Sequence, residues 1–80
     1  MTLSCIIRFE STSVELSVAS DSTSEWLWSI RLLNGNTLER GTSLSQTAAQ
    51  IVAQRVLEAR LKRAELGRWV PQTYRWTQHS

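Results

Sequence analysis

The sequence predicts an α+β fold, in which a four-stranded antiparallel β-meander packs one long C-terminal α-helix on one face (ββββα). Three segments within residues 1–43 alternate apolar and polar side chains with the period of two that half-buried strands require, and a hairpin signal after the third implies a fourth strand. Residues 45–66 then form a helix-favouring segment without Gly or Pro. The connections between the strands are short, which makes sequential antiparallel pairing the default.

The first two strands are expected at residues 3–9 and 14–19, separated by a polar turn. Alternation places the larger apolar side chains of both strands on one face. These core-facing residues are Leu3, Cys5, Ile7 and Phe9 in the first strand and Val14, Leu16 and Val18 in the second. Because the turn between them is short, we expect an antiparallel hairpin.

The third strand, residues 26–33, has the clearest alternation in the chain. One face would carry Trp26, Trp28, Ile30 and Leu32, and the other Leu27, Ser29, Arg31 and Leu33. The Asn34-Gly35 dipeptide that follows is a strong hairpin signal, so residues 36–42 are expected to return as the fourth strand.

Two registers are possible for this second hairpin. A two-residue Asn34-Gly35 turn pairs Ile30 with Glu39 and mixes apolar and polar faces. A three-residue loop, residues 33–35 with Gly35 left-handed, pairs Ile30 with Leu38 instead and sets Arg40 opposite Trp28, where a cation–π contact could form. We favour the second register because the apolar pattern then agrees across the pair.

The helix, residues 45–66, has recognisable ends. Ser45 is the expected N-cap, with Ser43 as the alternative, and Gly67 is placed for a left-handed C-terminal residue. The helical period predicts that small residues face the sheet, namely Ala48, Ala49, Val52, Ala53, Val56 and Ala59. Ile51, Leu57 and Leu61 flank this stripe, and at least one of them is expected to stay partly exposed or to meet the tail.

The 80 residues are expected to form a single domain, with the meander at 1–43, the helix at 44–67 and a tail at 68–80. Pro71 would prevent the helix from continuing into the tail. The tail is too apolar for a free end, so it should fold back over the helix flank or form a binding surface. His79, near the C-terminus, is expected to be frayed.

Several classes of function are disfavoured by the composition. Cys5 and His79 are the only cysteine and histidine, so no metal site, no cofactor and no Ser/His/Asp triad is expected, and we predict a protein that is not an enzyme. Cys5 should behave as a small core residue. With no apolar run long enough to span a membrane and no signal sequence, a cytoplasmic protein without membrane contact is expected.

One cluster stands out as a candidate partner-binding site at the helix end and tail. Its members are Arg60, Arg63, Arg68, Trp69, Tyr74, Arg75 and Trp76. Arg, Trp and Tyr are enriched in the hot spots of protein interfaces, and the same mixture serves single-stranded nucleic-acid binding. Residues 44–80 carry six basic against two acidic side chains, which favours an acidic partner. Besides a protein interface and a nucleic-acid surface, a third interpretation is purely structural: the aromatic rings cap the core and the arginines are solvated.

The outer face of the sheet is a second candidate surface. Ile6, Leu27 and Leu33 would lie there with Arg31 between them, and a single helix covers only one face. These apolar residues are therefore either solvent-exposed or covered by a partner. Self-association into a homodimer, through this face or through an edge strand, stays open as an alternative.

The size and layout of the chain, a strand meander plus one helix without catalytic groups, are similar in style to small accessory proteins of phages and mobile elements. Those proteins include inhibitors of host defence such as anti-CRISPR proteins. The likeness implies a protein–protein interaction that inhibits a host complex, which is the concrete form of our primary hypothesis. The alternative hypothesis is a nucleic-acid-binding domain that uses the arginine–aromatic cluster.

Overall fold

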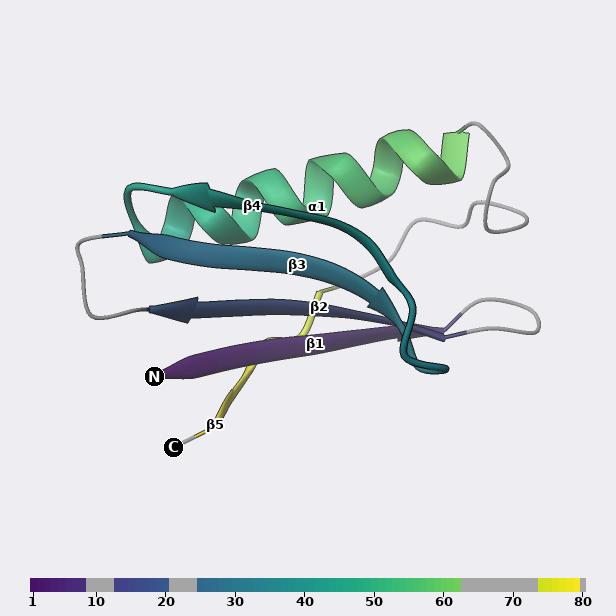
Figure 1. Cartoon of the computed structure of the whole chain (residues 1–80), viewed down its shortest axis with the longest axis horizontal. Coiled ribbons are helices and arrows are strands. Elements are labelled where there is room, and N and C mark those ends of the chain that lie inside the picture. The colour runs from purple at the N-terminus through teal and green to yellow at the C-terminus, as the bar shows by residue number, and fades with distance from the viewer. Residues whose placement is uncertain (9–12, 21–24, 63–73, 80) are drawn as a thin grey trace.

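The structure is a computed structural model that describes residues 1–8, 13–20, 25–62 and 74–79. Its elements are β1 (Thr2–Arg8), β2 (Ser13–Ser20), β3 (Trp26–Leu32), β4 (Thr37–Ser43), α1 (Gln46–Lys62) and β5 (Thr77–His79). The strands form one antiparallel sheet in the order β4-β3-β2-β1-β5, and α1 lies along one face of it (Figure 1). The predicted α+β architecture, four sequentially paired strands followed by a helix, is confirmed.

The core lies between α1 and the facing side of the sheet. Alternate residues of β1, β2 and β3 supply its large side chains, as the period of two predicts. The buried apolar residues are Leu3, Cys5, Ile7, Val14, Leu16, Val18, Trp28, Ile30, Ala49, Ala53 and Leu57. The predicted core position Phe9 lies outside the described residues.

The helix begins where the capping signal predicts. Ser45 Oγ accepts a hydrogen bond from the Ala48 N–H at 3.1 Å, which satisfies one of the N–H groups that the first helical turn leaves unpaired. At the other end α1 is described as far as Lys62, so the predicted last turn and the Gly67 cap lie outside the described residues.

The face that α1 buries differs from the prediction. Ala49, Ala53 and Leu57 are fully buried, whereas Ala59, predicted to face the sheet, is exposed. Ala49, Ala53 and Leu57 recur every four residues, so the contact stripe is rotated towards Leu57, whose larger side chain fills space that alanines would leave empty. The expectation that one flanking residue stays exposed is confirmed by Ile51, which is 42% exposed.

The loop of the β3–β4 hairpin matches the favoured prediction. The Leu32 N–H donates to the Asn36 carbonyl at 2.8 Å, which leaves a three-residue loop, and Gly35 within it has a φ of 104°. The Asn34 side chain steadies the turn by accepting a hydrogen bond from the Asn36 N–H at 3.0 Å.

Beyond the loop the predicted register is wrong. Arg31 pairs with Thr37, but Ile30 pairs with Glu39, because the register shifts between Ile30 and Arg31 and leaves Leu38 as the extra residue of a β-bulge. Trp28 consequently lies opposite Gly41 rather than Arg40, and the predicted Trp28–Arg40 cation–π pair is not formed across the strands.

The tail ends in a strand that the sequence did not predict. Thr77–His79 forms β5 and pairs with Thr2–Ser4 of β1. Ser4 Oγ and His79 Nε2 also lie 2.6 Å apart, in hydrogen-bond contact. The expectation that His79 is frayed is therefore wrong. Backbone pairing at the open edge of β1 requires no apolar side chain, so composition gave no signal for this strand.

Candidate functional site

The predicted arginine–aromatic cluster is only partly described. Arg63, Arg68 and Trp69 lie outside the described residues. Arg60 is engaged within the fold, since its Nη2 donates to the Leu38 carbonyl at 3.1 Å and its Nε to Glu39 Oε2 at 3.3 Å. This guanidinium therefore ties α1 to the bulged part of β4.

The two described rings of the cluster, Tyr74 and Trp76, pack against the hydrophobic core. The Tyr74 hydroxyl donates to Glu58 Oε1 at 3.1 Å. Burial, and then the charge and hydrogen bond of Glu58, raise the pKa of Tyr74 well above its ordinary value, so the phenol stays protonated at neutral pH. Arg75, between the two rings, points to solvent. In this region the interpretation that the rings cap the core and an arginine is solvated agrees with the structure.

Cys5 lies beneath this cap. It is 3% exposed, as expected for a small core residue. Burial raises the pKa of its thiol, although a hydrogen bond to the backbone of Arg75 acts in the opposite direction. A buried, protonated thiol is a poor nucleophile, so Cys5 contributes packing here.

The sheet face opposite α1, hereafter the outer face, is not covered by any described element (Figure 1). Three large apolar residues are exposed on it or at its loop: Ile6 (53%), Leu27 (43%) and Leu33 (55%). The prediction that Ile6 and Leu27 face away from the helix is confirmed by the strand pairing, and Leu33 is exposed in the loop that follows β3. Contiguous exposed apolar patches mark interaction surfaces, and Ile6 on β1 and Leu27 on β3, separated by β2, are the apolar residues that the strands offer on this face.

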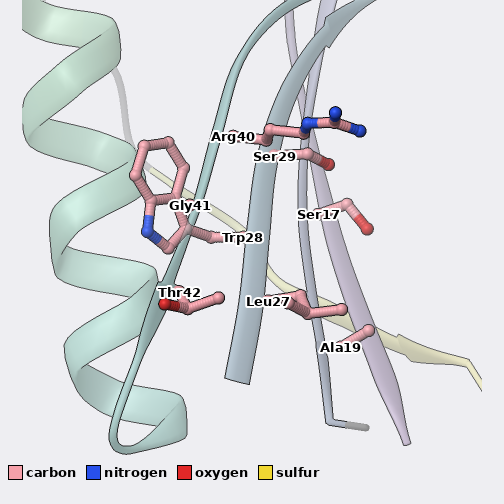
Figure 2. Close-up of a pocket in the computed structure, with 8 residues that line it drawn as sticks. All are labelled: Ser17, Ala19, Leu27, Trp28, Ser29, Arg40, Gly41 and Thr42. Atoms are coloured by element: carbon pink, nitrogen blue, oxygen red, sulfur yellow. The ribbon is translucent and has the colours of Figure 1, made fainter. Parts of the chain in front are cut away.

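An open hollow of about 620 Å³ lies on the outer face across β2, β3 and β4. It is lined by Ser17, Ala19, Leu27, Trp28, Ser29, Arg40, Gly41 and Thr42. Figure 2 shows the side chains of Leu27, Ser29 and Arg40 on the side of β3 away from the helix, and the ring of Trp28 on the helix side. The hollow is open because most of its lining side chains are small. Leu27 and Arg40 are the large outward side chains that line it.

Strand pairing explains how the hollow is assembled. Ser17, Ser29 and Arg40 occupy one row across the three strands. A second row, two residues further along each strand, holds Ala19, Leu27 and Thr42. The first row supplies hydroxyls and a cation, and the second supplies the apolar side chains of Ala19 and Leu27 next to the hydroxyl of Thr42. The hollow therefore offers two chemically different subsites side by side.

The outer face is electrostatically positive. Arg31 forms an ion pair with Glu15, which neutralises both side chains. Arg8 and Arg40 also project from this face, and neither has an ion pair with any described acidic residue. The outward positions of strands β1–β4 thus carry three arginines against one glutamate, and Arg40 is the cation at the hollow.

Sequence reasoning placed Leu27 and Arg31 on the outer face but missed the hollow and the position of Arg40 beside it. The bulge at Leu38 decides which β4 side chains lie beside Ser29, and no sequence pattern reveals a single-residue bulge. Ser17, Ala19 and Ser29 are small residues at outward strand positions, and this pattern could have indicated a depression in the outer face.

The described residues include one serine–histidine pair but no metal-binding cluster. They contain no group of three or more His, Cys, Asp or Glu side chains placed to bind a metal ion. Ser4 and His79 form a serine–histidine pair, but no described carboxylate hydrogen-bonds the histidine, so the third member of a triad is lacking there. No described helix is long and apolar enough to cross a membrane.

Comparison of the chain with models of known protein families, with curated proteins and with solved structures gave no match.

Proposed function

We infer that this protein is a small non-enzymatic binding module that covers a surface of another protein with the outer face of its sheet. The observation that carries this proposal is the exposure of Ile6, Leu27 and Leu33 on and beside a sheet face that no described element covers. Burying apolar surface against a partner contributes about 25 cal/mol for each Å² removed from water, from which the entropy and desolvation costs of association are subtracted.

A protein partner fits this face better than nucleic acid does. Surfaces that bind single strands stack bases on exposed aromatic rings. The described outer-face positions carry no Trp, Tyr or Phe, because the ring of Trp28 lies on the helix side and Trp26, Tyr74 and Trp76 pack against the core. The imidazole of His79, in hydrogen-bond contact with Ser4, is the one described ring at this face. The nucleic-acid alternative now depends on Arg75 together with Arg63, Arg68 and Trp69, which lie outside the described residues.

The more concrete form of the proposal is inhibition of a host complex by a phage or mobile-element accessory protein. It rests on the size and layout of the chain. A rigid sheet face can block a partner's surface by occupancy alone, so this form of inhibition requires no catalytic group.

The test is an affinity capture from nuclease-treated bacterial lysate with a matched pair of variants. Leu27 on the outer face and Ile51 on α1 are 43% and 42% exposed, so Leu27→Asp and Ile51→Asp introduce the same charge at equally accessible apolar sites. We expect one stoichiometric protein that Leu27→Asp loses and Ile51→Asp retains, with unchanged circular dichroism for both. A partner lost only with Ile51→Asp would place the interface on the helix and refute the proposed surface.

A further inference from the structure

We propose that the hollow binds an extended partner segment in which an acidic residue and an apolar residue are two positions apart. Arg40 is the group that binds the carboxylate, and Leu27 with Ala19 forms the contact for the apolar side chain. This inference rests on the proposed function and specifies the chemistry of the partner.

The spacing follows from the two rows of the hollow. Arg40 lies beside Ser29, and Leu27 is two residues from Ser29 on β3. Two residues along a strand span about 7 Å. In an extended partner segment, residues two apart also point the same way and are separated by about 7 Å. An acidic–x–apolar segment lying along β3 therefore presents both side chains to the hollow at once.

The chemistry of each row selects its occupant. The guanidinium of Arg40 can bind a carboxylate through two parallel N–H donors, and the Ser17 and Ser29 hydroxyls in the same row can donate further hydrogen bonds. Leu27 and Ala19 offer only carbon atoms, so they contribute by excluding water from an apolar side chain.

Charge complementarity distinguishes this occupant from a second copy of the chain. The acidic residue of the described outer face, Glu15, is already paired with Arg31, whereas Arg8 and Arg40 have no described acidic partner. Two outer faces brought together would oppose like charges, which disfavours a face-to-face homodimer. An acidic segment is attracted to the same face.

The test is a selection of phage-displayed random heptapeptides on the immobilised wild-type protein. We expect enriched peptides to carry Asp or Glu two positions from an aliphatic or aromatic residue. Arg40→Gln should weaken their binding at least tenfold. Arg55→Gln, which removes the same charge from an exposed position on α1, should leave binding unchanged. Both variants should keep the wild-type melting temperature, because each side chain is exposed.

Enrichment of peptides without acidic residues, or of acidic peptides that bind Arg40→Gln as well as wild type, would overturn the inference. The inference would also be overturned if no peptide were enriched and an oligo(dT) strand bound in a way that depends on Arg40. The site would then select phosphate. A lysate partner that Leu27→Asp loses and Arg40→Gln retains would refute the acidic chemistry while leaving the proposed function standing. Absence of any partner or peptide would reject both.

Discussion

The indole ring of Trp28 lies directly against Gly41 of the neighbouring strand. A β-carbon at Gly41 would be 2.7 Å from Cζ2 and 2.8 Å from Cε2 of the ring, closer than non-bonded carbon atoms can approach. Because Gly41 has no side chain, the ring can cover the backbone of β4 while staying 7% exposed. Gly41 is the cross-strand partner of Trp28, so Arg40, the preceding residue, lies on the outer face.

Gly41→Ala should therefore lower the free energy of unfolding by about 1–3 kcal/mol, the usual effect of overpacking a core. Equilibrium urea denaturation measures the change. In the background of Trp28→Leu, whose side chain lacks the ring, the same substitution should have a much smaller effect. Equal effects in both backgrounds would show that the ring contact does not constrain Gly41.

Leu57→Ala tests which face of α1 is buried. Leu57 is fully buried, so we expect a loss of about 2–5 kcal/mol in the free energy of unfolding, as is typical when a large core side chain is truncated. Ile51→Ala, on the exposed side of the same helix, should change it by less than about 0.5 kcal/mol. Similar losses for both would favour the originally predicted Ala/Val stripe.

Tyr74 should make stability depend on alkaline pH. Its pKa is raised in the folded protein, so the unfolded chain releases the phenolic proton first, near its ordinary value of 10.0. The contribution of Tyr74 is thus complete below pH 10 and is lost as pH rises above it. Tyr74→Phe should remove this dependence and, at neutral pH, cost about 0.5–1.5 kcal/mol for the hydrogen bond to Glu58.

The measurement is urea denaturation between pH 7 and 11. Burial also raises the pKa of Cys5 above its ordinary value of 9.0, so Cys5 adds a second loss that begins at lower pH. Comparing Tyr74→Phe with its parent in a Cys5→Ala background separates the two. If Tyr74→Phe left the pH dependence of the free energy of unfolding unchanged, the buried hydrogen bond between Tyr74 and Glu58 would be contradicted.

Trp76 and Arg75 should behave differently although they are adjacent. Trp76 packs against the core, so Trp76→Ala is expected to lower the melting temperature by several degrees. Arg75 is exposed, and Arg75→Ala should leave the melting temperature within about one degree, because exposed substitutions rarely change stability. Differential scanning calorimetry measures the melting temperatures of both variants. If Trp76→Ala left the melting temperature unchanged, Trp76 would again be a candidate for contact with a partner.

Much of the fold could be predicted because alternation and capping act locally. The first three strands follow from the period of two, and the fourth follows from the Asn34-Gly35 hairpin signal. The helix start follows from the Ser45 side chain, and the three-residue loop from the left-handed Gly35. The bulge at Leu38 and the burial of Leu57 could not be predicted, since both depend on how two elements fit together. Strand β5 pairs with β1 through backbone hydrogen bonds, so the residue types of this segment did not predict it.

The candidate surface was less predictable than the fold. Leu27 and Ile6 are outward by simple alternation, so their exposure could be foreseen. The position of Arg40 depends on the bulge, and the hollow depends on which small residues meet across three strands. For Tyr74 and Trp76 the ring types indicated a possible interface, but the same rings also suit the core, and only the packing separates the two uses.

Site-specific photocrosslinking tests the central claim, that the outer face contacts a protein partner, most directly. A benzophenone amino acid would replace Leu27 in one variant and Ile51 in the other, at sites of nearly equal exposure. Illumination in bacterial lysate should give a discrete crosslinked protein from position 27 and none from position 51. A crosslink from position 51 alone, or none from either position, would contradict the claim.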